Sequence, residues 1–199
     1  MAGTVKTYDN TKTIWKACDI WFDCSIPAAA AKPTLATDGT PDATANPTAK
    51  HAGYLRGGTK AMYKWEKKDA RDDQHTAPHR SKRTGEEMRV ESRWLQVLDA
   101  TLLNLLASGG TLSTVSDGKL VEFGGNRTIT TTCVYVIGER VDSPGKYICF
   151  VIFAAISTEG VEFTFSEEDE NDSPLGLTGQ VIASRADGKQ LGSIYIQDS

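Results

Sequence analysis

The segment from residue 146 to 157, KYICFVIFAAIS, constrains the fold more than any other part of the chain. Apart from its first residue it carries no charged side chain, and turn sequences bound it at residues 142–145 and 159–160. A short apolar run between turns is typical of a strand that is covered on both faces. We therefore expect a central strand with protein layers on both sides and with Phe150 and Phe153 in the core.

Alternating or β-branched segments, separated by turn residues, indicate further strands. Residues 59–68 alternate apolar and polar side chains, and Asp117-Gly118 predicts a two-residue hairpin turn. The further expected strands cover residues 18–26, 54–68, 87–97, 111–116, 119–123, 127–138, 161–166, 178–185 and 191–197. The pattern predicts a mainly β fold, a β-sandwich or barrel of roughly eight strands with one principal short helix packed on it and long polar loops.

The helix is expected near the middle of the chain. Residues 100–108, ATLLNLLAS, place four leucines on a broad apolar face that fits packing onto a sheet. Asp99 can cap the first turn, and the two glycines that follow the segment supply a stop. A single helix over residues 86–107 is the alternative, because Trp94 and Leu98 also fit a helical period.

Two long segments carry too few apolar residues to form a core of their own. Residues 27–53 contain four prolines and two glycines, which leaves little room for a helix or a central strand. This segment is either a linker or a loop held by a partner, and its place near the N-terminus argues against a linker. Residues 69–85 mix both signs of charge with almost no hydrophobic side chain. We expect a single domain over residues 1–199, with the charged loop as the tip of a long hairpin.

Composition and charge exclude several functional classes. The chain has 22 Lys and Arg against 26 Asp and Glu, a net charge of −4, which disfavours a protein that holds nucleic acid tightly. No apolar run approaches the roughly 20 residues that cross a bilayer, and residues 1–10 lack the apolar core of a signal peptide. The four cysteines match no disulfide scaffold, so we expect reduced thiols and folding in a cytoplasm.

The motifs that carry enzymatic or metal chemistry are incomplete. His75 and His79 have the spacing of metal ligands on a helix, but Pro78 breaks the helix and a third ligand is missing. The acidic run at 167–172 is typical of a solvated loop rather than of paired catalytic carboxylates. The nearest P-loop match, after Gly138, has the wrong spacing, and all three histidines fall in polar loops. We expect no catalytic residue, no cofactor and no metal, and therefore not an enzyme.

Two passages of the sequence resemble a known family. Residues 69–106, DARDDQHTAPHRSKRTGEEMRVESRWLQVLDATLLNLL, combine a charged loop, an alternating strand and a Leu-rich short helix. An earlier passage carries Trp15, Asp19, Ile20 and Trp21 and then a turn at residues 38–42. Together these passages span about half of the chain. They are similar to the tail tube (major tail) proteins of long-tailed bacteriophages.

The resemblance implies a structural role in the virion. Such proteins form rings, typically of six subunits, whose inner sheets join into a β-barrel around a channel. The rings stack around the tape measure protein and meet tail terminator and tail-tip proteins. They conduct DNA only in transit, have no membrane partner, and are assembled in the host bacterial cytoplasm. The alternatives are another ring-forming tail component, such as a terminator, baseplate hub or contractile-system inner tube, and a β-barrel enzyme or small-molecule binder.

The charged loop over residues 69–85 is the predicted contact between stacked rings. A segment with so few apolar side chains cannot order itself, since fixing each residue costs about 1–2 kcal/mol. Both signs of charge suit a head-to-tail stack of identical subunits. The residues that we expect to carry this contact are Arg71, Asp72, Asp73, Arg80, Lys82 and Arg83.

Overall fold

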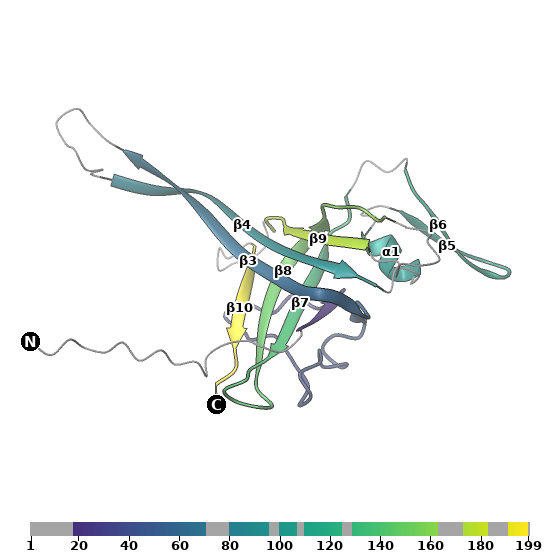
Figure 1. The fold of residues 1–199 in the computed structure, drawn as a ribbon, viewed down its shortest axis with the longest axis horizontal. Coiled ribbons are helices and arrows are strands. Elements are labelled where there is room, and N and C mark those ends of the chain that lie inside the picture. Colours follow the sequence, from purple (N-terminus) through teal and green to yellow (C-terminus); the bar gives the residue numbers. More distant parts are fainter. Residues whose placement is uncertain are drawn as a thin grey trace, which may run out of the picture.

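The computed structural model describes residues 18–70, 80–95, 100–106, 110–124, 129–162, 173–182 and 191–198. Within these ranges the chain forms ten strands and one helix (Figure 1). The strands are β1 (Cys18–Phe22), β2 (Lys50–His51), β3 (Leu55–Ala70), β4 (Arg80–Trp94), β5 (Thr111–Val115), β6 (Gly118–Glu122), β7 (Thr132–Glu139), β8 (Tyr147–Ser157), β9 (Ser173–Gly179) and β10 (Gly192–Ile196). The helix α1 (Ala100–Leu106) follows β4. The predicted mainly β fold with one short helix is confirmed.

β8 is the central strand, as its apolar sequence predicts. β7 pairs antiparallel along one side of β8. The other side is shared, because β10 pairs with residues 148–152 and β9 with residues 155–157. β9 continues the sheet to β4 and β3, while β7 continues it to β1 and β2. The sheet thus divides beside β8, and β3, β4 and β9 cross over β7, β8 and β10 in Figure 1.

The main core lies between these two layers. Its side chains come from one face of each strand, as the two-residue period of a strand requires. The helix adds its leucine face, which confirms the predicted packing of a short helix onto a sheet. The buried residues include Ile20 and Phe22 of β1, Val134 and Val136 of β7, Phe150 and Ile152 of β8, Met88, Val90 and Trp94 of β4, Leu175 and Leu177 of β9, and Leu102, Leu103 and Leu106 of α1.

The other face of β7 and β8 carries a second core. Tyr135, Val151 and Phe153 are buried there, because alternate residues of each strand point to opposite faces. Leu35 and Ala49 of the proline-rich segment pack against this cluster. The segment over residues 27–53 therefore covers a sheet of its own chain. The sequence alone allowed either a linker or a loop held by a partner.

Specific contacts hold the proline-rich segment in place. The buried Asn46 side chain accepts a hydrogen bond from the Ser25 N–H at 2.9 Å and donates to the Thr34 carbonyl at 3.2 Å. Gly39 has a φ of 84°, and a Cβ there would lie 2.2 Å from the ring of Tyr147. Glycine is therefore required both by the left-handed backbone and by the close approach to Tyr147.

Some predicted boundaries differ from the structure at turns. β1 ends at Phe22 rather than at residue 26, because Asp23 turns the chain with a φ of 55°. The turn between β5 and β6 is formed by residues 116–117, one residue earlier than predicted, since Val115 pairs with Gly118.

Other boundaries differ along the strands. β9 lies at residues 173–179 and not at 178–185, and the expected strand at 161–166 lies mostly outside the described residues. The single helix over residues 86–107 is wrong, because β4 pairs with β3 and β9 as far as Trp94. The expected capping residue Asp99 is not among the described residues.

Candidate assembly surfaces

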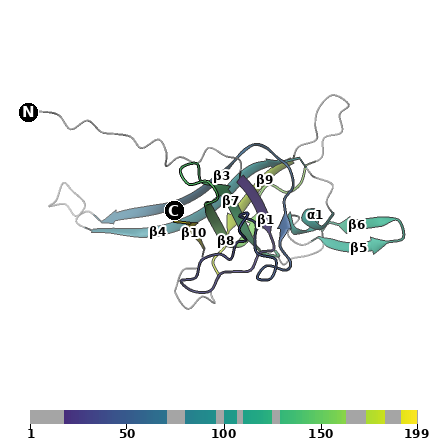
Figure 2. The same ribbon diagram turned by 90° about the horizontal axis from the view of Figure 1, so that it is seen from below.

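β3 and β4 extend far beyond the body of the protein (Figures 1 and 2). β9 pairs with β4 only over residues 89–94, whereas the pairing of β3 with β4 continues to Ala70 and Arg80. We call the outer half of this hairpin, residues 63–70 and 80–87, the arm. At about 3.3 Å per residue the arm projects roughly 25 Å.

The arm replaces part of the predicted charged loop. β3 includes Asp69, and β4 begins at Arg80, so residues 69–70 and 80–85 are paired strands and not loop. Backbone pairing satisfies the N–H and C=O groups that the two strands turn toward each other, whatever their side chains are. The Ser81 hydroxyl adds a hydrogen bond of 2.6 Å to the Asp69 carboxylate. Residues 71–79, which contain the predicted contact residues Arg71, Asp72 and Asp73, lie outside the described residues.

Lys82 and Arg83 belong to two basic cross-strand pairs on the arm. Arg83 lies opposite Lys67, and Lys82 lies opposite Lys68. Like charges directly opposite each other destabilise a two-stranded ribbon. Because alternate residues of a strand point to opposite faces, the two basic pairs lie on opposite faces of the arm. Carboxylates compensate part of this charge, because Lys67 is ion-paired with Asp69 at 3.2 Å and Arg83 with Glu86 at 2.6 Å. The Lys68–Lys82 pair is therefore the part of the arm that best fits an acidic group of a partner.

One face of the arm is also aromatic. Tyr63, which lies opposite the buried Met88, is 42% exposed, and Trp65 is 51% exposed. The Arg83 guanidinium lies 5.3 Å from the centre of the Trp65 ring and donates hydrogen bonds to the Tyr63 hydroxyl and, at 2.6 Å, to the Glu86 carboxylate. The bond from Arg83 lowers the pKa of Glu86. The arm thus continues the core face of β4 outward as an ordered amphipathic surface.

Two of the edge strands, β3 and β10, differ in character. Among the described strands, none pairs with the outer side of β3 or with the side of β10 away from β8. β3 carries Lys60, Lys64, Lys67 and Lys68 and is irregular at residues 57–58, where two glycines have φ values of 78° and 92°. Lysines and bulges discourage the addition of another strand. β10, with the sequence GSIYI, has no charge and no proline, so its edge can accept a strand.

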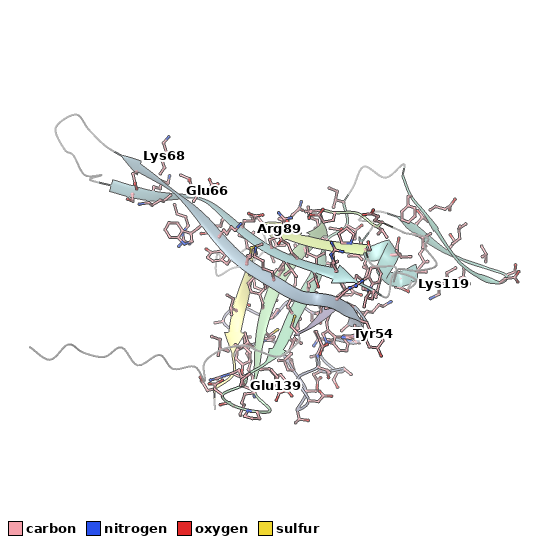
Figure 3. The ribbon with its side chains drawn as sticks, in the orientation of Figure 1. Tyr54, Glu66, Lys68, Arg89, Lys119 and Glu139 are labelled. Carbon is pink, nitrogen blue, oxygen red and sulfur yellow. The ribbon has the colours of Figure 1, made fainter. Side chains whose placement is uncertain are left out.

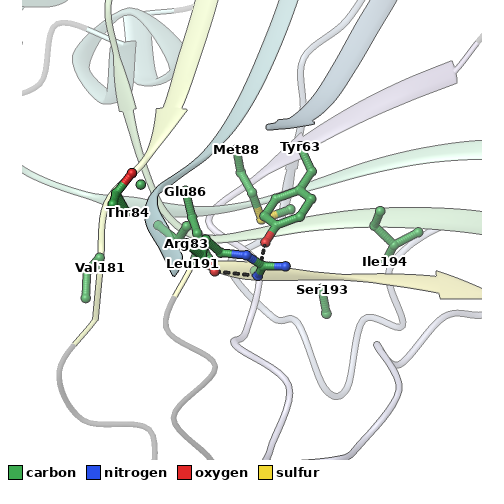
Figure 4. Close-up of a pocket in the computed structure, with 11 residues that line it drawn as sticks. Tyr63, Arg83, Thr84, Glu86, Met88, Val181, Leu191, Ser193 and Ile194 are labelled. Atoms are coloured by element: carbon green, nitrogen blue, oxygen red, sulfur yellow. Dashed lines mark hydrogen bonds and ion pairs between the residues drawn. The ribbon is translucent and has the colours of Figure 1, made fainter. Parts of the chain in front are cut away.

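A cleft of about 770 Å³ lies between β10 and the base of the arm (Figure 4). Tyr63 and Met88 line one side, and Leu191 and Ile194 line the other. Its ionisable side chains, Arg83 and Glu86, are bonded to each other. Gly192 permits this geometry, because a Cβ there would lie 2.1 Å from the Val151 carbonyl oxygen and 2.5 Å from the sulfur of Met88. The cleft is therefore a largely apolar groove alongside the free edge of β10.

A second hairpin, β5–β6, projects from the opposite end of the molecule (Figure 2). Val115 and Leu120 share one face, because Leu120 pairs with Ser113, two residues before Val115. Both are nearly half exposed, and Phe123, just after β6, is 61% exposed. Although α1 contacts both strands of the hairpin, this cluster stays exposed, and exposed apolar clusters mark binding surfaces. The β5–β6 hairpin is therefore a second candidate surface.

Groups that could support other chemistry are few in the described part of the chain. No three His, Cys, Asp or Glu side chains lie together there in a metal-binding group, and no helix there is long and apolar enough to cross a membrane. Cys24, Cys133 and Cys149 are buried free thiols. Burial raises the pKa of Cys133 to about 12 and also raises the pKa values of Cys24 and Cys149. Such thiols remain protonated and are poor nucleophiles.

No model of a known protein family matches this sequence, and no curated protein matches it.

Sequence reasoning missed the free edge of β10 and the cleft beside it. The strand was expected at residues 191–197, but its place at an edge depends on how the sheet divides beside β8. One signal was present in the sequence. The segment GSIYI has no charged residue, whereas β3, another edge strand, carries four lysines.

Proposed function

We propose that this protein is the tail tube subunit of a long-tailed bacteriophage, which forms rings that stack into the conduit for genome delivery. The observation that carries the proposal is the combination of an uncharged free edge at β10 with a charged arm on the same molecule. An unprotected edge supports lateral pairing between subunits of a ring. A projecting arm supports contact with the next ring. Six subunits per ring is the expected number.

The two surfaces have different roles in this proposal. The apolar cleft beside β10 provides most of the binding energy between subunits, because exposed charge pairs add little affinity. The arm sets the register of the stack through its charges. Its contact residues are Lys82 and Arg83, together with Arg80 and with Arg71, Asp72 and Asp73 from the sequence between the two strands.

The remaining partners follow from the same role. The tube encloses the tape measure protein, ends at terminator and tail-tip proteins, and contacts DNA only during its passage. A net charge of −4 fits a channel that does not retain DNA, since like charges repel. The protein is assembled in the bacterial cytoplasm and located in the virion. This role needs no catalytic residue and no cofactor.

Negative-stain microscopy of the purified chain tests the proposal. We expect tubes of constant bore from the wild-type protein. Replacing residues 70–84 by a few Gly and Ser residues should leave a folded subunit, by circular dichroism and melting temperature, that no longer builds tubes. Isolated monomers at every concentration of the wild type would contradict the proposed function. Tubes of normal length and bore from the shortened variant would show that the arm is not the stacking element.

A further inference from the structure

Most of the exposed large apolar side chains of the described residues lie at two places on opposite sides of the body. One group surrounds the cleft, and the other lies on the β5–β6 hairpin. Around the cleft, Tyr63, Trp65, Val181, Ile194 and Ile196 are each at least 42% exposed, and on the hairpin Val115, Leu120 and Phe123 are each at least 45% exposed. Figures 1 and 2 both show the arm and the hairpin pointing away from each other. The two groups therefore cannot meet within one chain.

We infer that the β5–β6 hairpin of one copy inserts into the cleft beside β10 of the next copy. The inference rests on the proposed function in one respect, namely that the partner is a second copy of this chain. It adds the identity of the surface that fills the cleft.

Shape and backbone pairing support this fit. The hairpin is convex and narrow, and the cleft is concave and open along β10 (Figure 4). β5, β6 and β10 are each five residues long, so either strand of the hairpin can pair along the whole of β10. Pairing would give the two-stranded hairpin a third strand and would satisfy the free edge of β10. Leu120 and Val115 would then face Ile194 and Met88.

Charge is complementary as well. The base of the arm lines the cleft, and the arm carries the Lys68–Lys82 cross-strand pair together with Lys67 and Arg83, which are ion-paired to Asp69 and Glu86. The hairpin carries Asp117 at its turn and Glu122 near its base, against the single cation Lys119. Figure 3 shows Lys68 and Lys119 at opposite ends of the molecule, so the arm's cations are far from the hairpin of their own chain. A second copy can bring the acidic turn to the Lys68–Lys82 pair.

The placement also determines the kind of assembly. A projection and a cleft on different sides of one subunit form a heterologous contact, in which each copy binds one neighbour by its hairpin and another by its cleft. Such contacts close into a ring or continue as a filament. A symmetric dimer cannot satisfy both surfaces in this way.

Two single variants of the full chain test the inference, with assembly measured by analytical ultracentrifugation. Leu120→Asp alters the hairpin and leaves the cleft intact, whereas Ile194→Lys alters the cleft and leaves the hairpin intact. Each alone should weaken self-association at least tenfold. A one-to-one mixture should form a heterodimer that grows no further, because only one intact hairpin and one intact cleft remain per pair. Val181→Lys is a second cleft variant in case Ile194→Lys does not fold.

Val141→Asp is the matched control, because Val141 is 40% exposed but lies on neither surface. It should assemble as the wild type does. Normal assembly of Leu120→Asp, or a mixture that stays monomeric, would overturn the inference. If the wild type and Leu120→Asp both form tubes, the hairpin contact fails while the proposed function stands. If the wild type forms rings that never stack, and Leu120→Asp abolishes them, the tube function fails while the hairpin contact stands.

Discussion

The inner and outer halves of the hairpin β3–β4 have the same backbone pairing but opposite surroundings. In the inner half, β4 also pairs with β9, and Val90 and Trp94 are at most 2% exposed. In the outer half the two strands pair only with each other among the described residues, and Trp65 is 51% exposed. Regular pairing alone therefore does not bury a ribbon. Burial requires a second layer, so the inner half stabilises the fold and the outer half is available for binding.

The largest expected effect comes from the inner half. Trp94 is buried, and its indole N–H donates a hydrogen bond of 2.5 Å to the Ala52 carbonyl. Trp94→Ala leaves a cavity in the main core and an acceptor without its donor, so the free energy of unfolding should fall by about 3–5 kcal/mol. Chemical denaturation measures this loss. A loss below about 1 kcal/mol, the scale of an exposed substitution, would remove the distinction between the two halves.

The second effect uses pH to separate the buried body from the exposed arm. Folding raises the pKa of Cys133 to about 12, mainly through burial, against about 9 for a free thiol. Below pH 9 the thiol is protonated in both states and the full stability is present. Between pH 9 and 12 the unfolded chain loses the proton and the folded chain keeps it. The free energy of unfolding should then fall by up to about 1.4 kcal/mol per pH unit for each buried thiol.

One variant isolates the contribution of this thiol. Cys133→Ala should reduce the alkaline loss of stability relative to the wild type. Denaturation curves at pH 8 and pH 10 supply the comparison. An unchanged slope in Cys133→Ala would mean that the alkaline loss arises elsewhere.

The sequence predicted the body better than the surfaces, for physical reasons. The run at 146–157 identified the central strand because burial on both faces demands an apolar sequence. The ends of the charged segment were predicted as loop but are strands. Ser81 and Lys82 give no apolar signal in the sequence, although their backbone pairs with β3. The partner of the proline-rich segment could not be read from its composition, since Leu35 and Ala49 pack on a sheet formed by distant residues.

A third prediction compares two glycines with nearly the same backbone conformation. Gly39 has a φ of 84° and Gly145 a φ of 80°, but only at Gly39 would a Cβ meet a neighbour, the Tyr147 ring. Gly145→Ala should cost about 1 kcal/mol through backbone strain alone. Gly39→Ala should cost about 2–3 kcal/mol, because the aromatic ring must also move. Equal losses in thermal unfolding would show that the proline-rich segment is not fixed through Tyr147.

The smallest effect on stability is expected in the outer half, where Trp65→Ala removes a large but half-exposed side chain. Its described ring contact is with Arg83, and a cation–π contact at an exposed site contributes about 0.5–1 kcal/mol. The free energy of unfolding should therefore change by no more than about 1 kcal/mol, while self-association weakens at least tenfold, because Trp65 stands beside the cleft that receives the neighbouring copy. Tyr54→Ala is the matched control, since Tyr54 is 78% exposed on the body and should affect neither quantity. A loss of stability as large as that of Trp94→Ala would make the arm part of the folding core. Unchanged association would instead exclude Trp65 from the interface and limit the contact to β10.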